Sequence, residues 1–168
     1  MTETQSIIDE LRQAHDGSPW HGSSRADLLL GVTAAEAARR PISEAHTIWE
    51  LVLHMTAWTS EVTRRMLGHA PGTPLEGDWP IPPATPSEAD WRGAIAALQY
   101  AHSGLVSVVQ EFEESRLGTR VGDERNPALG SGVTYGAMLH GVAQHDAYHS
   151  GQIAILKKFG AARAPGTA

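Results

Sequence analysis

The sequence contains no cysteine among its 168 residues, and this absence excludes two kinds of site. No disulfide framework can form, and no thiolate can hold a metal ion. Any metal ligand must therefore be an imidazole, a carboxylate or water, and the chain has no cysteine nucleophile of its own. A chain of this length can bury a sizeable core without such cross-links, so we expect one domain.

The sequence also has little positive charge. It contains only two lysines, and its formal net charge is −6 with histidine neutral. Its densest basic clusters are the pairs Arg39–Arg40, Arg64–Arg65 and Lys157–Lys158. We therefore expect no nucleic-acid partner. The N-terminal 15 residues contain early acids and no continuous apolar run, so we expect neither a secretory signal nor a membrane anchor, and a cytoplasmic location.

Apolar periodicity predicts an all-α fold. We expect helices at about 3–16, 48–67, 86–116 and 133–159, with a broken helical segment at about 24–38. Helix starts are indicated where a hydroxyl residue is followed three places later by an acid. Four such pairs occur: Ser24 with Asp27, Thr33 with Glu36, Thr47 with Glu50, and Thr85 with Glu88. We expect a single domain over residues 1–160 and a disordered tail over 161–168.

Apolar residues in the third predicted helix recur at alternating four- and three-residue steps, as in the seam of an antiparallel helical bundle. The seam consists of Trp91, Ile95, Leu98, His102, Leu105, Val109 and Phe112. The pattern predicts a bundle of four long helices, with long loops between the second and third and between the third and fourth. The first of these loops is rich in proline, and either a pocket roof or a stiff crossover would explain it.

Histidine is the residue in surplus, with nine copies. His145 and His149 lie four residues apart in the fourth predicted helix, so their side chains leave the same face about one turn apart. That face also carries Met138, Val142 and Ile153, which indicates that both rings point into the bundle. The pair could chelate one ion, and two hydrogen-bonded core histidines are the alternative.

His54 is the candidate for a third imidazole. It lies at the edge of the apolar stripe of the second predicted helix, facing inward. Together with His145 and His149 it would form a facial set of three nitrogens, leaving positions on the ion for water or substrate. Taken alone, His54 also fits the interpretation of a core histidine.

Five further residues are candidates for positions around this site or in a pocket beside it. They are Glu50, His102, Asp146, Tyr148 and Gln152. Glu50 also fits the helix cap begun by Thr47, and His102 also fits a core position. Asp146 and Tyr148 flank the histidine pair, and Gln152 could contact a metal-bound water or substrate.

The remaining histidines have simpler interpretations. His140 lies too far around the helix to share the face of His145, so we interpret it as structural. His21 falls in a turn, and we expect surface exposure there. His15, His46 and His69 are expected at surface or cap positions.

Two segments carry the three candidate ligands. They are PWHGSSRADLLLGVTAAEAARRPISEAHTIWELVLHMTAW, residues 19–58, and HGVAQHDAYHSGQIAILKK, residues 140–158. They resemble the first half and the last helix of the DinB-like family, also called the DinB/YfiT-like metalloenzymes. The resemblance implies a four-helix bundle with an internal metal site formed by His54, His145 and His149, and the sequence departs from the family at none of these positions.

The resemblance also suggests a chemistry, since characterised relatives include metal-dependent thiol transferases and a thiol-dependent isomerase. A divalent ion held by three neutral imidazoles can acidify a bound thiol or water. Our first hypothesis is therefore a transferase that activates a low-molecular-weight thiol cosubstrate, such as bacillithiol or mycothiol, toward a small-molecule electrophile. A hydrolase using metal-bound water and a non-enzymatic metal-binding protein are the alternatives.

Several properties stay open at this point. Zinc or nickel is the expected metal, with iron and manganese as alternatives, because all four accept imidazole ligands. Helical bundles with exposed apolar edges often form homodimers, although no segment of this sequence identifies an interface. We expect no membrane partner.

Overall fold

The computed structural model describes residues 1–161. Every named element among these residues is a helix, which confirms the all-α prediction. The elements are α1 (Glu3–His15), α2 (Arg25–Leu29), α3 (Ala34–Ala38), α4 (Ile48–Met66), α5 (Glu88–Gln110), a 3-10 helix η1 (Glu114–Arg116) and α6 (Tyr135–Ala161). Among the described residues, β-pairing is limited to isolated bridges in the 117–134 loop. The predicted disordered tail lies outside the described residues, apart from Ala161 at the end of α6.

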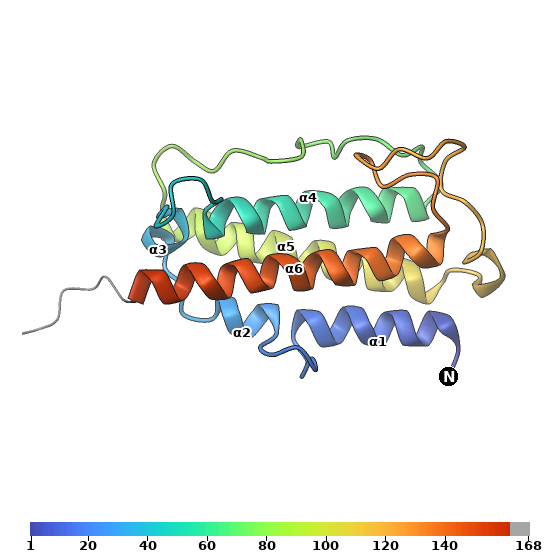
Figure 1. The fold of residues 1–168 in the computed structure, drawn as a ribbon, viewed down its shortest axis with the longest axis horizontal. Coiled ribbons are helices and arrows are strands. Elements are labelled where there is room, and N and C mark those ends of the chain that lie inside the picture. The colour runs from blue at the N-terminus through green and yellow to red at the C-terminus, as the bar shows by residue number, and fades with distance from the viewer. Residues whose placement is uncertain (162–168) are drawn as a thin grey trace, which may run out of the picture.

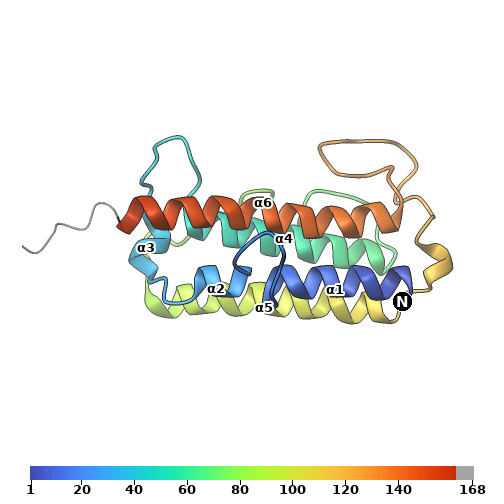
Figure 2. The same ribbon diagram turned by 60° about the horizontal axis from the view of Figure 1, so that its bottom comes forward.

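The long helices α1, α4, α5 and α6 lie side by side along the length of the molecule (Figures 1 and 2). The helices α1 and α6 run in one direction, whereas α4 and α5 run in the other. The helix α5 is therefore antiparallel to α1 and α6, as predicted, but parallel to α4. The proline-rich segment 67–87 makes this possible, because it crosses back along α4 before α5 begins (Figure 1). None of the described helices is both long enough and apolar enough to cross a membrane.

The helix starts follow the predicted caps at three of the four positions. Ser24 accepts a hydrogen bond from the Asp27 N–H, and complete capping boxes form at Thr33 and at Thr47. The start of α5 differs from the prediction at Thr85, since Ser87 accepts the hydrogen bond of the Asp90 N–H.

A long-range contact explains where α5 begins. Glu88, the expected partner of Thr85, instead accepts a hydrogen bond of 2.8 Å from the Ala34 N–H at the start of α3. The predicted end of this helix, at residue 116, is also wrong, because α5 stops at Gln110. The chain bends there and turns Leu117 and Val121 into the core.

The core has two apolar clusters, one toward each end of the molecule. The first cluster includes Val62 of α4, Leu105 of α5 and Leu139 of α6. The second includes Leu51, Leu98 and Ile153 of the same three helices. Between the two clusters lies a polar middle section, formed by His15, Arg25, His54, His102, His145, Asp146 and His149. The candidate ligands therefore lie at the middle of the bundle, between its two apolar ends.

Candidate metal centre

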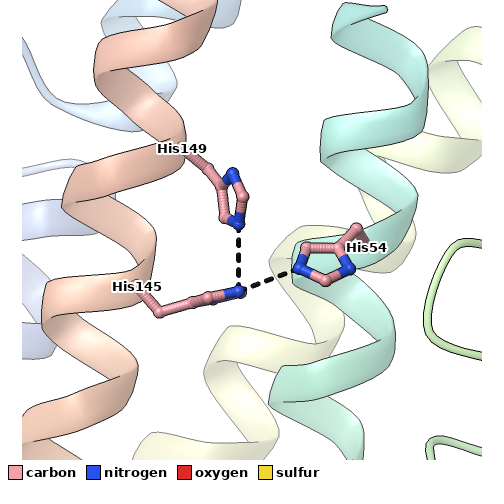
Figure 3. Close-up of side chains that lie close together, drawn as sticks. All are labelled: His54, His145 and His149. Carbon is pink, nitrogen blue, oxygen red and sulfur yellow. Dashed lines mark hydrogen bonds between the residues drawn. The ribbon is translucent and has the colours of Figure 1, made fainter. Parts of the chain in front are cut away.

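His54 projects from α4 toward His145 and His149, which project from α6 (Figure 3). The Nε2 atom of His145 lies 3.0 Å from that of His54 and 3.1 Å from that of His149. His54 and His149 are buried, and His145 is partly buried. The structure thus brings together the three histidines that the sequence singled out, in a group that could hold a metal ion.

Two of these rings have a defined orientation because of their Nδ1 partners. His54 Nδ1 lies 2.6 Å from the Asp78 carbonyl oxygen, and His149 Nδ1 lies 2.6 Å from Gln152 Oε1. Both partners can only accept, so each Nδ1 carries the hydrogen and each Nε2 is left with a lone pair. Ligating histidines commonly have such acceptors on the nitrogen that faces away from the metal.

The three Nε2 atoms cannot all be paired by hydrogen bonds among themselves. His145 Nε2 can donate one hydrogen at most, yet lone pairs of both His54 and His149 face it at hydrogen-bond distance. A cation at their centre would be attracted by all three lone pairs. The donor set, three neutral imidazoles without thiolate or carboxylate, is one that zinc, nickel and iron accept. The residues present therefore fit a divalent metal ion.

The electrostatics also favour neutral rings. Burial, together with the neighbouring His149 and His54, lowers the pKa of His145 to about 3. Burial also lowers the pKa of His54 and of His149. The hydrogen bonds to the Asp78 carbonyl and to Gln152 oppose this decrease without cancelling it. All three rings are consequently neutral near pH 7, which is the form that binds metals.

The segment Asp78–Trp79 is part of this site, although sequence reasoning missed it. In addition to the Asp78 carbonyl contact, the Trp79 ring stacks on His54 with centroids 3.8 Å apart, and His46 also stacks on Trp79. Trp58 Nε1 donates to Asp78 Oδ1 at 2.7 Å, which ties the segment to α4. The proline-rich loop is thus both a crossover and a wall of the site, and only the aromatic residue within it could have drawn attention.

The other predicted site residues lie in different surroundings. Gln152 contacts His149 as described, and the largely exposed Tyr148 packs edge-on against the same ring. Glu50 completes the cap of α4 and pairs with Arg40 at 2.6 Å. Its carboxylate is therefore engaged by the cap and by Arg40.

Asp146 and His102 belong to a second buried polar group beside the triad. Asp146 pairs with Arg25 Nη1 at 2.5 Å, and Arg25 Nη2 donates to His15 Nδ1 at 2.7 Å. The His15 ring in turn stacks on His102, with centroids 3.9 Å apart. Complete burial raises the pKa of Asp146, and Arg25 opposes this increase. The structure thus groups His102 with His15 and Arg25.

Of the two positions expected for His15, surface or cap, the surface position is wrong, since only 6% of this last residue of α1 is exposed. The end of α1 packs near α2 and α5, which places His15 against Arg25 and His102. His21, His46 and His69 are exposed, in agreement with the sequence. His140 is partly exposed and lies 2.8 Å from Glu10 Oε2.

The fold and the site together define an all-helical protein with an internal histidine triad that could hold a metal ion. The chain belongs to the DinB superfamily, whose family model matches residues 24–153, a range that contains all three histidines. No curated protein and no solved structure matches the chain.

Proposed function

We propose that the protein is a metal-dependent transferase of the DinB/YfiT-like four-helix-bundle type, which binds one divalent ion at His54, His145 and His149. Zinc or nickel is the proposed ion. The observation that supports this site is the convergence of two fixed lone pairs on a third Nε2 at 3.0 and 3.1 Å. In the proposed reaction, a low-molecular-weight thiol is transferred to a small electrophile.

The chemistry follows from the charge of the donor set. A divalent ion that is held by neutral ligands keeps its charge and lowers the pKa of a thiol placed next to it. The Asp78 carbonyl and Gln152 hold the His54 and His149 rings in place, and the chain has no cysteine, so the sulfur comes from a cosubstrate. The sulfur forms a bond to the electrophilic carbon, the leaving group departs with its electron pair, and the thiol proton passes to solvent.

A thiol-consumption assay tests this proposal. Protein loaded with zinc or nickel is mixed with bacillithiol or mycothiol and with 1-chloro-2,4-dinitrobenzene, and the formation of the thioether and chloride is followed. We expect turnover in the native protein and loss of turnover in the His145→Ala/His149→Ala variant. If the protein instead releases acid and alcohol from an ester in the absence of thiol, the proposed transferase is wrong and the protein is a hydrolase. Loss of stability without any activity, on removal of the metal, would indicate a structural ion.

A further inference from the structure

A cavity of about 430 Å³ adjoins the histidine triad. It begins at His54 and His145 and extends between α4 and α6 toward the first turns of α6, where residues 127–130 of the 117–134 loop line it. Its volume falls within the range of small-molecule sites in proteins. A molecule in this cavity would have one end beside the Nε2 atoms of His54 and His145.

The walls of the cavity are mainly apolar. They include Val62 of α4, Met138 and Val142 of α6, and Leu129 and Val133 of the loop. Val62, Met138 and Val142 also belong to the apolar core cluster at this end of the molecule, so they are held by packing on their other sides. The cavity thus offers a fixed apolar surface.

Among the residues that the structure describes, Arg65 is the one lysine or arginine that lines this cavity, and its guanidinium is already engaged by other groups of the protein. Its Nε donates to Glu61 Oε1 at 2.9 Å, its Nη1 to the Leu129 carbonyl at 2.8 Å and its Nη2 to the Gly72 carbonyl at 2.9 Å. Both Arg65 and Glu61 are only 1% exposed. The guanidinium therefore joins the two long loops to α4, and it is not free to pair with an anionic ligand.

The 117–134 loop is fixed next to the cavity by its own backbone. Val121 N donates to the Val133 carbonyl at 2.8 Å, and Gly132 N donates to the Val121 carbonyl at 2.7 Å. Gly132 has a φ of +72°, and a Cβ there would lie 2.5 Å from Arg125 Cα, so the close approach requires glycine. Together with the Arg65 contacts, this indicates that the cavity is already formed before a ligand binds.

We propose that this cavity binds an uncharged apolar small molecule and that this molecule is the electrophilic substrate. Away from the proposed metal site, an anionic group would lose its hydration without gaining a free cationic partner from the apolar walls, whereas an uncharged ligand would bury its apolar surface against them. The ligand class follows from the walls of the cavity. Its identification as the electrophile rests on the proposed function.

Gly141 offers a direct way to fill the cavity. It lies on α6 one turn before His145, it lines the cavity, and a Cβ at this position would meet no atom within 4 Å. A leucine side chain in a helix leans toward the helix N-terminus, which is the direction in which the cavity extends from His145. Gly141→Leu should therefore fill the cavity without a clash. Gly93→Leu is the matched control, because Gly93 is an exposed glycine in α5 with the same free space.

Two fluorescent probes that differ by one charged group test the ligand class in the full-length protein, both metal-loaded and ion-free, because an ion at the histidines would itself attract the charged probe. N-Phenyl-1-naphthylamine is uncharged, and 8-anilinonaphthalene-1-sulfonate is its sulfonated counterpart. We expect the uncharged probe to bind at about one molecule per chain, with an affinity about tenfold or more above that of the sulfonate. Gly141→Leu should weaken its binding by about tenfold or more, and Gly93→Leu should leave it unchanged.

Equal affinities for the two probes, or unchanged binding in Gly141→Leu, would overturn the inference. Elemental analysis and a thermal melt of Gly141→Leu verify that the variant keeps its metal and its fold. If they show damage, Gly141→Ala takes its place, with a smaller expected loss of probe affinity.

A kinetic comparison separates this inference from the proposed function. If thiol transfer occurs, 1-chloro-2,4-dinitrobenzene should react faster than the anionic 4-chloro-3,5-dinitrobenzoate, and Gly141→Leu should remove most of this difference. Equal rates with both electrophiles would contradict the inference and leave the transferase intact. The expected probe selectivity without any thiol transfer would support the apolar site and contradict the transferase.

Discussion

At the scale of single residues, the Nδ1 atoms of His54 and His149 determine what their Nε2 atoms can do. An acceptor at Nδ1 fixes the hydrogen there and leaves the lone pair of Nε2 directed at the centre of the triad. The acceptor of His54 is the backbone carbonyl of Asp78, which no substitution removes directly. The acceptor of His149 is the side chain of Gln152, so its contribution can be measured.

Replacing Gln152 with leucine should weaken metal binding. Without the amide oxygen, His149 is free to change its tautomer and to rotate, and the loss of such a partner typically lowers metal affinity by about 10- to 100-fold. Competition with a chromophoric chelator measures the affinity. Gln144→Leu provides the control, because Gln144 is exposed on the same helix. Equal zinc affinities in the native protein and Gln152→Leu would show that Gln152 does not support the metal site.

At the scale of elements, a buried ion pair joins α2 to α6 next to the triad. Arg25 and Asp146 are 1% and 2% exposed, and Asp146 directly follows His145 in α6. The short helix α2 has only five residues, so its position depends on contacts with its neighbours. The pair is one such contact, and it also connects α2 to the stacked rings of His15 and His102.

Asp146→Ala should lower the free energy of unfolding by about 3–5 kcal/mol, because the substitution leaves the Arg25 charge buried without its partner. Urea denaturation of the ion-free protein measures this effect separately from metal binding. The double variant Arg25→Met/Asp146→Leu should regain part of the lost stability, since it removes both charges. The exposed acid Asp123 offers a control, and Asp123→Ala should have little effect. An Asp146→Ala variant as stable as the control would refute a structural role for the pair.

The sequence allowed much of the helical framework to be predicted, because helix signals are local. Capping boxes at Thr33 and Thr47 and the apolar period placed α3 and α4 within a few residues of their observed bounds. The pair His145 and His149 could be predicted for the same reason, since the helical repeat alone puts both side chains on one face. The start of α5 could not be predicted in this way, because it depends on a tertiary contact between Glu88 and α3.

The surroundings of the triad were harder to predict, since they depend on how distant segments meet. Asp78 and Trp79 lie in a loop without periodicity, and nothing local shows that this loop returns along α4. Arg25 and His15 look like surface residues in sequence, and only the packing of α1, α2 and α6 reveals that they are buried together. The three proposed ligands could therefore be found from sequence, whereas most of their supporting contacts could not.

At the scale of the whole molecule, the polar middle section between two apolar clusters makes stability depend on pH. Burial and the positive charge of Arg25 together lower the pKa of His15 to about 4. Burial, the neighbouring His15 and Arg25 lower the pKa of His102 to about 3. In the unfolded chain these histidines take up protons near pH 6.5. Between these values the unfolded state binds more protons than the native state, so stability falls as the pH falls.

The free energy of unfolding of the ion-free protein should therefore decrease from pH 7.5 to pH 5.5. Well below pH 6.5, each such histidine lowers the free energy of unfolding by about 1.4 kcal/mol for each pH unit of acidification. Urea denaturation at several pH values gives the slope, and the triad histidines add to it in the same direction. The His15→Gln/His102→Gln variant should show a smaller slope than the native protein. The same slope in both proteins would contradict the assignment of this pair as buried neutral rings.

The metal content of the untagged protein, purified without chelators, tests the histidine site most directly. Elemental analysis should find about one divalent ion per chain in the native protein, because three imidazoles of a single site converge on one point. The His145→Ala/His149→Ala variant should contain almost none, while its helical content by circular dichroism stays close to that of the native protein. A native protein without metal, even after reconstitution with zinc or nickel, would show that the three histidines form a polar core instead of a metal centre.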